Sequence, residues 1–400
     1  MTSDLPPPDT AARAHSARVV ERIRGEIADS GGFIGFEQYM QTALYAPGLG
    51  YYVAGARKLG ADGDFVTGPE MTPLYGAALA RQIDAILDAT GARDIVELGA
   101  GSGALAHAIL GALEHSPVRY SILEVSPELR ARQEQALARL QQERAQPPAT
   151  AKHAAEARAP REAAGLHWLE TLPREIDGVV VLNEVLDALP PRVIARRDGA
   201  WLERGVAWDG AALVWAERPL DDARMQALVR ARFPAEGDYT SEINPAAEAL
   251  VATLARRLRR GAILIADYGF PRAEYYHPQR SDGTLVGHYR HRVHTDPFLW
   301  PGLSDLTAHV DFTAIAEAAE AAGLAVAGYS TQAAFLLGCG ILDRLAAAGA
   351  PDSRGYLREA AAVQKLLSPA EMGELFKVML LAPEPHSWKG LAVTDLTHRL

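Results

Sequence analysis

Acidic and amide side chains stand at or just beyond the ends of several apolar stretches of the 400-residue chain. Glu97 interrupts one such stretch, Glu124 comes near the end of the next, and Asn183 and Glu184 directly follow a third. In an open α/β sheet, ligands bind beyond the carboxyl ends of the strands, where such side chains would gather. We therefore expect these residues to line a ligand site, provided that the apolar stretches are neighbouring strands.

Three glycines at alternate positions follow the first apolar stretch, in the sequence Asp94-Ile-Val-Glu-Leu-Gly-Ala-Gly-Ser-Gly103. An Ala- and Leu-rich segment, 104–113, then has the composition of a helix. A strand, a glycine-rich turn and a helix open a nucleotide-binding α/β unit. Because glycine has no Cβ, it allows a tight turn and a close approach of the backbone to a ligand.

The glycine spacing favours S-adenosylmethionine (SAM) over a dinucleotide. Dinucleotide enzymes usually show Gly-x-Gly-x-x-Gly, whereas this loop reads Gly-x-Gly-x-Gly with an acid two residues before its first glycine. Glu124 lies 21 positions after Gly103, which is the usual separation for an acid that binds ribose hydroxyls. The sequence has no Gly-x-x-x-x-Gly-Lys-Ser/Thr phosphate loop. The expected cofactor-binding residues are Thr67, Gly68, Glu97, Gly99, Gly101, Ser102, Gly103, Glu124, Val125 and Asn183.

Residues 33–76 are dense in glycine, proline and aromatic residues and show little periodicity. Such a segment is costly to order unless it packs on something. It is either a packed N-terminal cap or a lid over the cofactor, with Thr67, Gly68, Pro69 and Glu70 closing on the ligand. Glu70 could instead be an acid at the N-terminus of the following helix.

The elements that would position these residues alternate between strands and helices, which predicts an α/β fold. We expect a seven-stranded, Rossmann-like class I methyltransferase sheet with an N-terminal helical and loop cap. The expected division is a cap or lid over residues 1–90 and a SAM-dependent methyltransferase domain over 91–400. Two insertions interrupt the second: a β-meander within about 192–245, indicated by Asp198-Gly199 and Asp209-Gly210 turns, and an irregular segment at 270–311. An Ala- and Pro-rich stretch at 145–164 is expected to be a mobile surface insertion.

Composition narrows the class of protein. The net charge of -10 argues against broad nucleic-acid binding. Cys339 is the single cysteine, so no internal disulfide can form. No apolar run is long enough to span a bilayer, and no signal-peptide core is evident, which predicts a cytoplasmic protein without a membrane partner. His288, His291 and His294 have a spacing that could suit a metal, but Arg290 and Arg292 lie between them, and no metal site is expected.

Four collinear stretches, within about residues 33–312, together resemble one family, the MidA-like methyltransferases. They are Tyr39-Met-Gln-Thr-Ala-Leu-Tyr-Ala-Pro-Gly-Leu-Gly-Tyr-Tyr52, Gly63-Asp-Phe-Val-Thr-Gly-Pro-Glu-Met-Thr-Pro73, Asn183-Glu-Val-Leu-Asp-Ala-Leu-Pro190, and the segment from Asp267-Tyr-Gly-Phe270 to Thr307-Ala-His-Val-Asp311. The family includes the mitochondrial arginine methyltransferase of respiratory complex I assembly. The resemblance implies SAM-dependent methyl transfer and, for that branch, symmetric dimethylation of an arginine on a complex I subunit.

An arginine acceptor would need carboxylates, because paired carboxylates bind the planar guanidinium through two parallel hydrogen bonds. Glu184 and Asp187 are the expected pair, although Asp187 could instead cap the turn before Pro190. His309 is expected to line the acceptor pocket. Asp311 is expected to cap the helix that starts at residue 312. The expected catalytic residues are therefore Glu184, Asp187 and His309.

The sequence thus favours a SAM-dependent protein arginine N-methyltransferase whose partner is a protein substrate, with a homodimer as an open possibility. Two alternatives stay open: a methyltransferase acting on a small molecule, and a SAM-binding assembly factor with little catalysis. The sequence alone does not name the acceptor.

Overall fold

The computed structural model describes residues 5–54, 67–114, 119–145, 165–384 and 388–400. The chain forms two compact units. Unit 1 contains Met1–Val66, Leu186–Val251 and Tyr268–Ile315, and unit 2 contains Thr67–Val185, Ala252–Asp267 and Ala316–Leu400. The stretch 67–90 thus groups with the glycine loop. Most of the expected mobile insertion at 145–164 lies outside the described residues.

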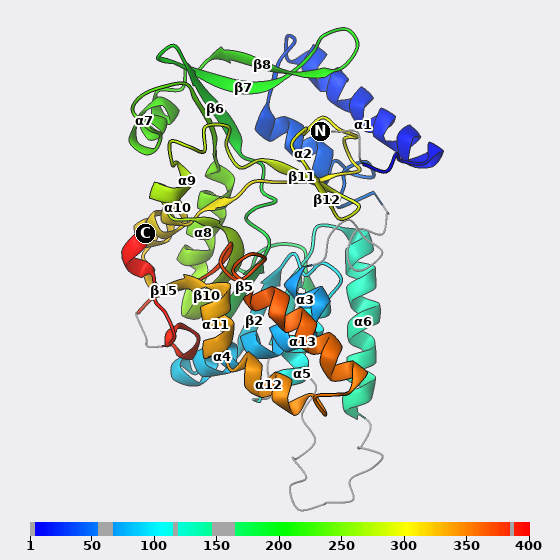
Figure 1. Cartoon of the computed structure of the whole chain (residues 1–400), viewed down its shortest axis with the longest axis vertical. Coiled ribbons are helices and arrows are strands. Elements are labelled where there is room, and N and C mark those ends of the chain that lie inside the picture. Colours follow the sequence, from blue (N-terminus) through cyan, green and yellow to red (C-terminus); the bar gives the residue numbers. More distant parts are fainter. Residues whose placement is uncertain (1–4, 55–66, 115–118, 146–164, 385–387) are drawn as a thin grey trace, which may run out of the picture. The chain divides into compact units, whose positions relative to one another are not determined.

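Unit 2 is built on the larger sheet, a mixed sheet whose strands follow the order β15-β16-β10-β5-β2-β3-β4 (Figure 1). The strands are β2 (Asp94–Leu98), β3 (Arg119–Leu123), β4 (Gly165–Leu169), β5 (Ile176–Asn183), β10 (Leu258–Phe270), β15 (Ala325–Thr331) and β16 (Phe376–Ala382). Strands β10, β5, β2, β3 and β4 pair in parallel, whereas β15 and β16 are antiparallel. The expected α/β fold is confirmed.

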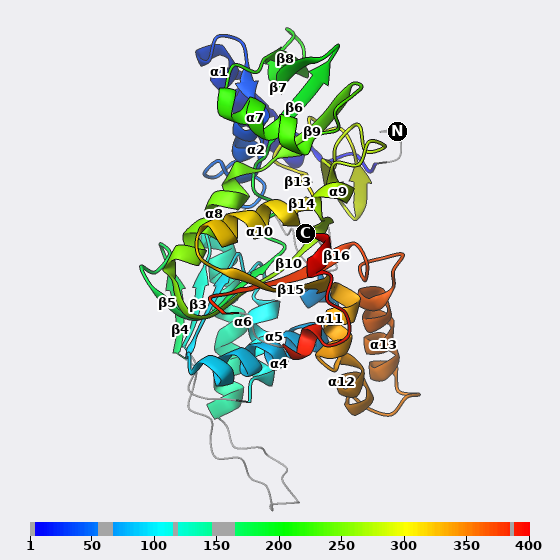
Figure 2. The ribbon, with the colours of Figure 1, turned by 90° about the vertical axis from the view of Figure 1, so that its left-hand side faces the viewer.

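Helices of unit 2 bury apolar faces against this sheet in one continuous core. Figure 2 shows α4, α5, α11, α12 and α13 gathered on one side of the sheet. The helices are α3 (Gly68–Met71), α4 (Pro73–Thr90), α5 (Ala104–Ala112), α6 (Pro127–Ala145), α11 (Gln332–Gly338), α12 (Ile341–Ala347) and α13 (Arg354–Leu367), with short 3₁₀ turns η1 (Lys389–Leu391) and η2 (Thr397–Arg399). Helix α4 has typical end signals, with Thr72 capping its N-terminus and Gly91 ending it in a left-handed conformation.

Unit 1 contains a five-stranded sheet in the order β1-β7-β6-β9, with β8 paired to β7, and a three-stranded sheet in the order β12-β11-β13. The strands are β1 (Ile34–Gly35), β6 (Arg192–Arg197), β7 (Ala200–Trp208), β8 (Leu213–Pro219), β9 (Tyr239–Ile243), β11 (Val286–Tyr289), β12 (Arg292–His294) and β13 (Asp305–Thr307). The short β14 (Val310–Asp311) pairs with the end of β10. The helices are α1 (Thr10–Asp29), α2 (Phe36–Tyr45), α7 (Ala223–Arg232) and α9 (Arg272–Tyr275), and α8 (Pro245–Arg257) and α10 (Phe312–Ala321) begin here.

Two features of unit 1 differ from the sequence-based expectation. The segment 270–311, expected to be irregular, holds the three-stranded sheet, because β11 pairs with β13 from a distant part of the segment. Strand β9, between two helices, was not expected; it pairs with β6, on the side of the meander opposite to β8. Strand β11 also pairs with β12 in a tight hairpin, but the partners of β13 and β9 lie farther away in sequence, so the local pattern carries little of the signal for those two strands.

No helix among the described residues combines the length and the apolar character that crossing a membrane would require.

Candidate functional site

The glycine loop joins β2 to α5 in a conformation that only glycine adopts without strain. Gly99, Gly101 and Gly103 have φ angles of 64°, 54° and 86°. A Cβ on Gly99 would lie 3.4 Å from a methyl group of Val185, and a Cβ on Gly103 would lie 3.4 Å from the backbone of Gln133. The loop is therefore a tight cradle whose three left-handed turns a side chain would strain.

Glu97 belongs to β2, two positions before Gly99, and its side chain is buried. Its carboxylate accepts a hydrogen bond of 2.7 Å from the Tyr120 hydroxyl. Burial raises the pKa of Glu97 to about 7, the Tyr120 hydrogen bond opposes that rise, and the nearby charge of Glu124 adds to it. Glu97 is thus a buried acid of β2 whose pKa lies near neutral pH.

Glu124 follows β3 and is held in place by α6. Its two carboxylate oxygens accept from the backbone N–H of Ser126 and from the side-chain amide of Gln133, each at 2.9 Å. The same Gln133 amide donates to the carbonyl oxygen of Gly101 at 2.9 Å, and its oxygen accepts from the indole of Trp168 at 3.0 Å. Gln133 therefore fixes the expected ribose acid and the glycine loop to each other.

The loop and Glu124 have the chemistry that a SAM site needs. A carboxylate offers about four lone-pair sites, so Glu124 can still accept from a ribose hydroxyl. Val125 is the next residue, and it is 68% exposed. Its side chain offers an apolar surface next to Glu124 on which the adenine base of the cofactor could pack. The glycine cradle leaves backbone groups within reach of a ligand. The residues present fit the cofactor.

Helix α3 reaches the glycine loop through Glu70, whose carboxylate accepts a hydrogen bond from the Ser102 hydroxyl. Thr72, not Glu70, caps α4, by accepting from the N–H of Leu74 at 3.1 Å. Thr67 precedes α3 and Gly68 is buried. Of the two expectations for Glu70, the contact favours a role at the loop.

The carboxyl ends of β5 and β10 place a second group of polar side chains in unit 2. Asn183 accepts from the Tyr75 hydroxyl at 2.7 Å and donates to the Glu184 carboxylate at 3.1 Å. Burial, with the charges of Glu184 and Asp267, raises the pKa of Tyr75 well above its usual value, so its hydroxyl stays protonated. Asn183 pairs with Ala266 across the strands, which explains why these groups meet.

Glu184 has a left-handed backbone, with φ at 53°. For a residue other than glycine this conformation costs roughly 1–3 kcal/mol, and such strain is concentrated at functional sites. Its N–H donates to the carbonyl of Ala266 at 2.9 Å, which anchors the strained turn to β10. The turn redirects the chain immediately after β5.

Asp187 belongs to unit 1, where it is buried. Burial raises the pKa of Asp187 to about 6, and a hydrogen bond from the Tyr268 hydroxyl opposes that rise. The backbone carbonyl of Asp187 accepts from the N–H of Ala308 at 3.0 Å. The expected pairing of Asp187 with Glu184 stays a prediction.

Tyrosines of the 39–52 stretch lie near Asp187 in unit 1. Tyr52 donates to Asp305 at 2.8 Å, and Tyr45 donates to the carbonyl of Ala188 at 3.0 Å. The two rings stack with centroids 5.4 Å apart. Burial raises the pKa of Tyr52 well above its usual value, and the charges of Asp305 and Asp187 add to the effect. Unit 1 thus gathers tyrosine hydroxyls and carboxylates from separate stretches.

His309 packs its ring edge-on against Tyr268 and Phe270, with centroids 5.1 and 5.3 Å away. Its role at an acceptor stays a prediction. Asp311 accepts from the N–H of Ala314 at 3.1 Å, so its expected role as a helix cap is confirmed.

Sequence reasoning missed Tyr75, Gln133 and Asp267 as members of these groups. Each looks like an ordinary residue of a helix or strand. Gln133 is buried, although it lies in a helix whose other described polar residues are partly or fully exposed. Its sequence context gives no signal of this, because its hydrogen-bond partners come from three other parts of the chain.

Comparison with known proteins identifies the chain's relatives. A family model described as "Putative S-adenosyl-L-methionine-dependent methyltransferase" matches residues 78–330. A mitochondrial protein arginine methyltransferase of Danio rerio is 31% identical over 86% of this chain and 82% of its own length. The corresponding human protein is 29% identical over 88% of this chain and 81% of its own length.

A crystal structure of a Burkholderia thailandensis protein bound to S-adenosyl-homocysteine is 45% identical. The alignment covers 99% of this chain and all of that one, with a TM-score of 0.89. The expectation of a cytoplasmic location is contradicted, since the curated relatives are named as mitochondrial proteins.

Proposed function

Because the chain belongs to this family of SAM-dependent methyltransferases, we propose that it transfers the methyl group of SAM to an arginine side chain of a protein. The relatives named as protein arginine methyltransferases support the acceptor class. Bound SAM supplies an electrophilic methyl group. The chain's own residues must then orient the acceptor and exclude water, because in-line displacement depends mainly on alignment.

The cofactor site that we propose is the glycine loop with its supporting residues. Gly99, Gly101 and Ser102 would contact the amino-acid portion, and Glu124 would bind the ribose hydroxyls. Val125 would cover one face of the base. We read the sheet of unit 2 as a class I methyltransferase sheet. The observation that carries the proposed cofactor site is the pair of hydrogen bonds from Gln133 to Glu124 and to Gly101.

The acceptor residues that we propose are Glu184, Asp187 and His309. The guanidinium is planar and cationic. Glu184, whose backbone is strained just beyond β5, places a carboxylate that could bind and orient it. Residues 1–66 and the two insertions make up most of unit 1, and we propose that this unit recognises the protein substrate. The family resemblance makes a subunit of respiratory complex I the first substrate to test.

Replacing Gly101 with valine tests the cofactor site. Valine at a φ of 54° is strained and places two methyl groups on the loop, so we expect SAM affinity to fall by about 100-fold or more, whereas the fold persists. Isothermal titration calorimetry measures the affinity. Gly111→Ala is the control, because a Cβ at Gly111 of α5 meets nothing within 4 Å. Unchanged affinity of Gly101→Val would show that the cofactor binds elsewhere.

Incubation with radiolabelled SAM and a lysate tests the reaction, followed by amino-acid analysis of labelled protein for methylarginines. We expect Glu184→Gln to lower the rate by about 100-fold or more with SAM affinity retained, because the amide cannot attract the guanidinium by charge. Glu170→Gln, at an exposed position, is the control. A labelled product that organic solvent extracts would favour a small-molecule acceptor. SAM binding without any transfer would favour an assembly factor.

A further inference from the structure

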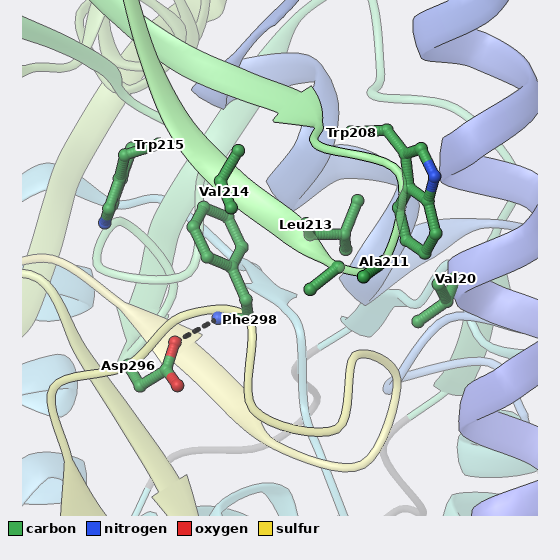
Figure 3. A pocket seen from close by; sticks show the side chains of 9 residues that line it. Val20, Trp208, Ala211, Leu213, Val214, Trp215, Asp296 and Phe298 are labelled. Carbon is green, nitrogen blue, oxygen red and sulfur yellow. Dashed lines mark hydrogen bonds between the residues drawn. The ribbon is translucent and has the colours of Figure 1, made fainter.

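An open pocket of about 550 Å³ lies in unit 1 along the edge of its larger sheet. Its lining includes residues 211–215, which run from the β7–β8 turn into β8, together with Val20, Trp208, Asp296 and Phe298. Consecutive residues of a strand point to opposite faces of its sheet, so a pocket that touches five in a row follows the strand's edge. Figure 3 shows Asp296 and Phe298 across from β8, with Trp208 and Val20 at the other end.

The outer edge of β8 is open within the described part of the chain, where β8 pairs only with β7. The N–H of Asp209 donates to the carbonyl of Ala212 across the turn. Hydrogen-bonded and non-hydrogen-bonded pairs alternate along an antiparallel ladder, and Trp208 pairs with Leu213 and Val206 with Trp215. The backbone groups of Leu213 and Trp215 therefore point away from β7, toward the pocket, as two pairs of hydrogen-bonding groups.

The charge around the pocket is negative. Asp296 accepts from the N–H of Phe298 through one oxygen at 3.0 Å (Figure 3). Asp209, at the turn, accepts from the N–H groups of Ala211 and Ala212, which lowers its pKa and keeps it ionised. Both acids retain lone pairs for another donor.

Two arginines stand near the tryptophan rings, and each has an acidic partner. Arg24 stacks on Trp208 and forms an ion pair of 3.1 Å with Glu21. Arg204 stacks on Trp215 with its guanidinium 3.8 Å from Glu217, a carboxylate that Arg197 also contacts at 3.3 Å. Asp296 is the charged residue among those that line the pocket, and Asp209 stands at the adjoining turn, which fits a basic occupant.

We infer that this pocket docks an extended, basic segment of the protein substrate, which adds as a strand to the open edge of β8. Backbone hydrogen bonds to Leu213 and Trp215 give affinity, an apolar side chain enters between Trp208 and Phe298, and an arginine or lysine faces Asp296. The inference rests on the proposed function in one respect, that the occupant belongs to the substrate. The segment is distinct from the arginine that is methylated.

The test is fluorescence anisotropy with a labelled hexapeptide that alternates valine and arginine, in the absence of SAM. We expect saturable binding to the full chain. The same peptide with methylated backbone nitrogens on its pairing edge should bind about tenfold more weakly or worse, because it cannot add as a strand. Asp296→Asn should weaken binding of the unmodified peptide about 3- to 5-fold, since the amide still accepts from Phe298 but has no charge. Asp221→Asn, an exposed acid of the same unit, should change nothing.

The inference is overturned if the valine–arginine peptide does not bind. It is also overturned if the backbone-methylated peptide binds the wild type as tightly as the unmodified peptide does and Asp296→Asn binds the unmodified peptide as tightly as the wild type does. Either result counts even if arginine methylation is observed. Edge-dependent binding supports it even if no methylarginine is found, in which case the proposed acceptor is wrong and the docking site stands. Circular dichroism melting of the two variants checks that each is folded.

Discussion

The two units each bury a glutamate, and they satisfy it in different ways. In unit 2, Glu97 accepts from one donor among the described residues, the Tyr120 hydroxyl. In unit 1, Glu242 of β9 accepts from the N–H groups of Thr284 and Leu285 and from the hydroxyls of Thr284 and Tyr275. Burial raises the pKa of both acids, and the donors around Glu242 oppose the rise.

The difference indicates two uses of a buried charge. Glu242 joins β9 to the segment that begins at residue 284 through these hydrogen bonds, so its role is structural. Among the described residues Glu97 has few donors, and its charge is poorly stabilised two residues before the glycine loop. A buried acid with many donors holds a fold together, whereas one with few donors makes a local site sensitive to pH.

The largest expected effect is that of Glu242→Ala. The substitution leaves the N–H groups of Thr284 and Leu285 buried without their acceptor, so we expect a loss of about 4 kcal/mol in the free energy of unfolding. Urea denaturation measures it. Glu242→Gln keeps one acceptor oxygen and should cost less. If the alanine variant is as stable as the wild type, the contrast between the two glutamates fails.

The next effect is on pH dependence, through Glu97→Gln. The folded pKa of about 7 lies above the ordinary value of 4.5, so the folded state binds the proton more tightly than the unfolded chain does. The wild type therefore loses stability as pH rises from about 4.5 to 7, by an amount of about 3 kcal/mol for this group. The glutamine variant lacks this loss. Urea denaturation of both proteins at several pH values gives the difference, and a difference independent of pH would contradict the assignment.

The smallest effect expected is that of Gln133→Ala. Without its amide, Glu124 and the carbonyl of Gly101 lose a shared donor, and we expect SAM affinity to fall about tenfold, equivalent to about 1.4 kcal/mol. Calorimetric titration measures the affinity, and Gln135→Ala, an exposed change on the same helix, is the control. An equal loss in both variants would mean that Gln133 acts only through the helix.

Local patterns explain why unit 2 could largely be predicted from sequence. The segment from Asp94 to Ala112 reads directly as strand, glycine turn and helix, and the acid after the next strand has a known spacing. The sequence also placed Asn183 and Glu184 at a strand end. It did not reveal Tyr75, because an aromatic residue at helical spacing looks like any core residue.

Parts of unit 1 could not be predicted from the sequence, because their structure depends on contacts with residues far away in the chain. Strand β9 reads Tyr-Thr-Ser-Glu-Ile, with all five residues buried, so no alternation of apolar and polar residues marks it. Glu242 is tolerated there only because Thr284 and Leu285 supply donors 42 and 43 residues later. A single sequence gives no means of pairing such segments.

The interleaving of the two units along the chain has a consequence for biosynthesis. The chain passes between unit 1 and unit 2 at residues 66, 185, 251, 267 and 315, and β10 runs through one of these crossings without a break. A ribosome that releases the chain from its N-terminus cannot finish unit 1 before residue 315 emerges, nor unit 2 before its last strand, β16. Partly made chains therefore expose unpaired strand edges for most of translation, and a chaperone that covers such edges would raise the yield of folded protein.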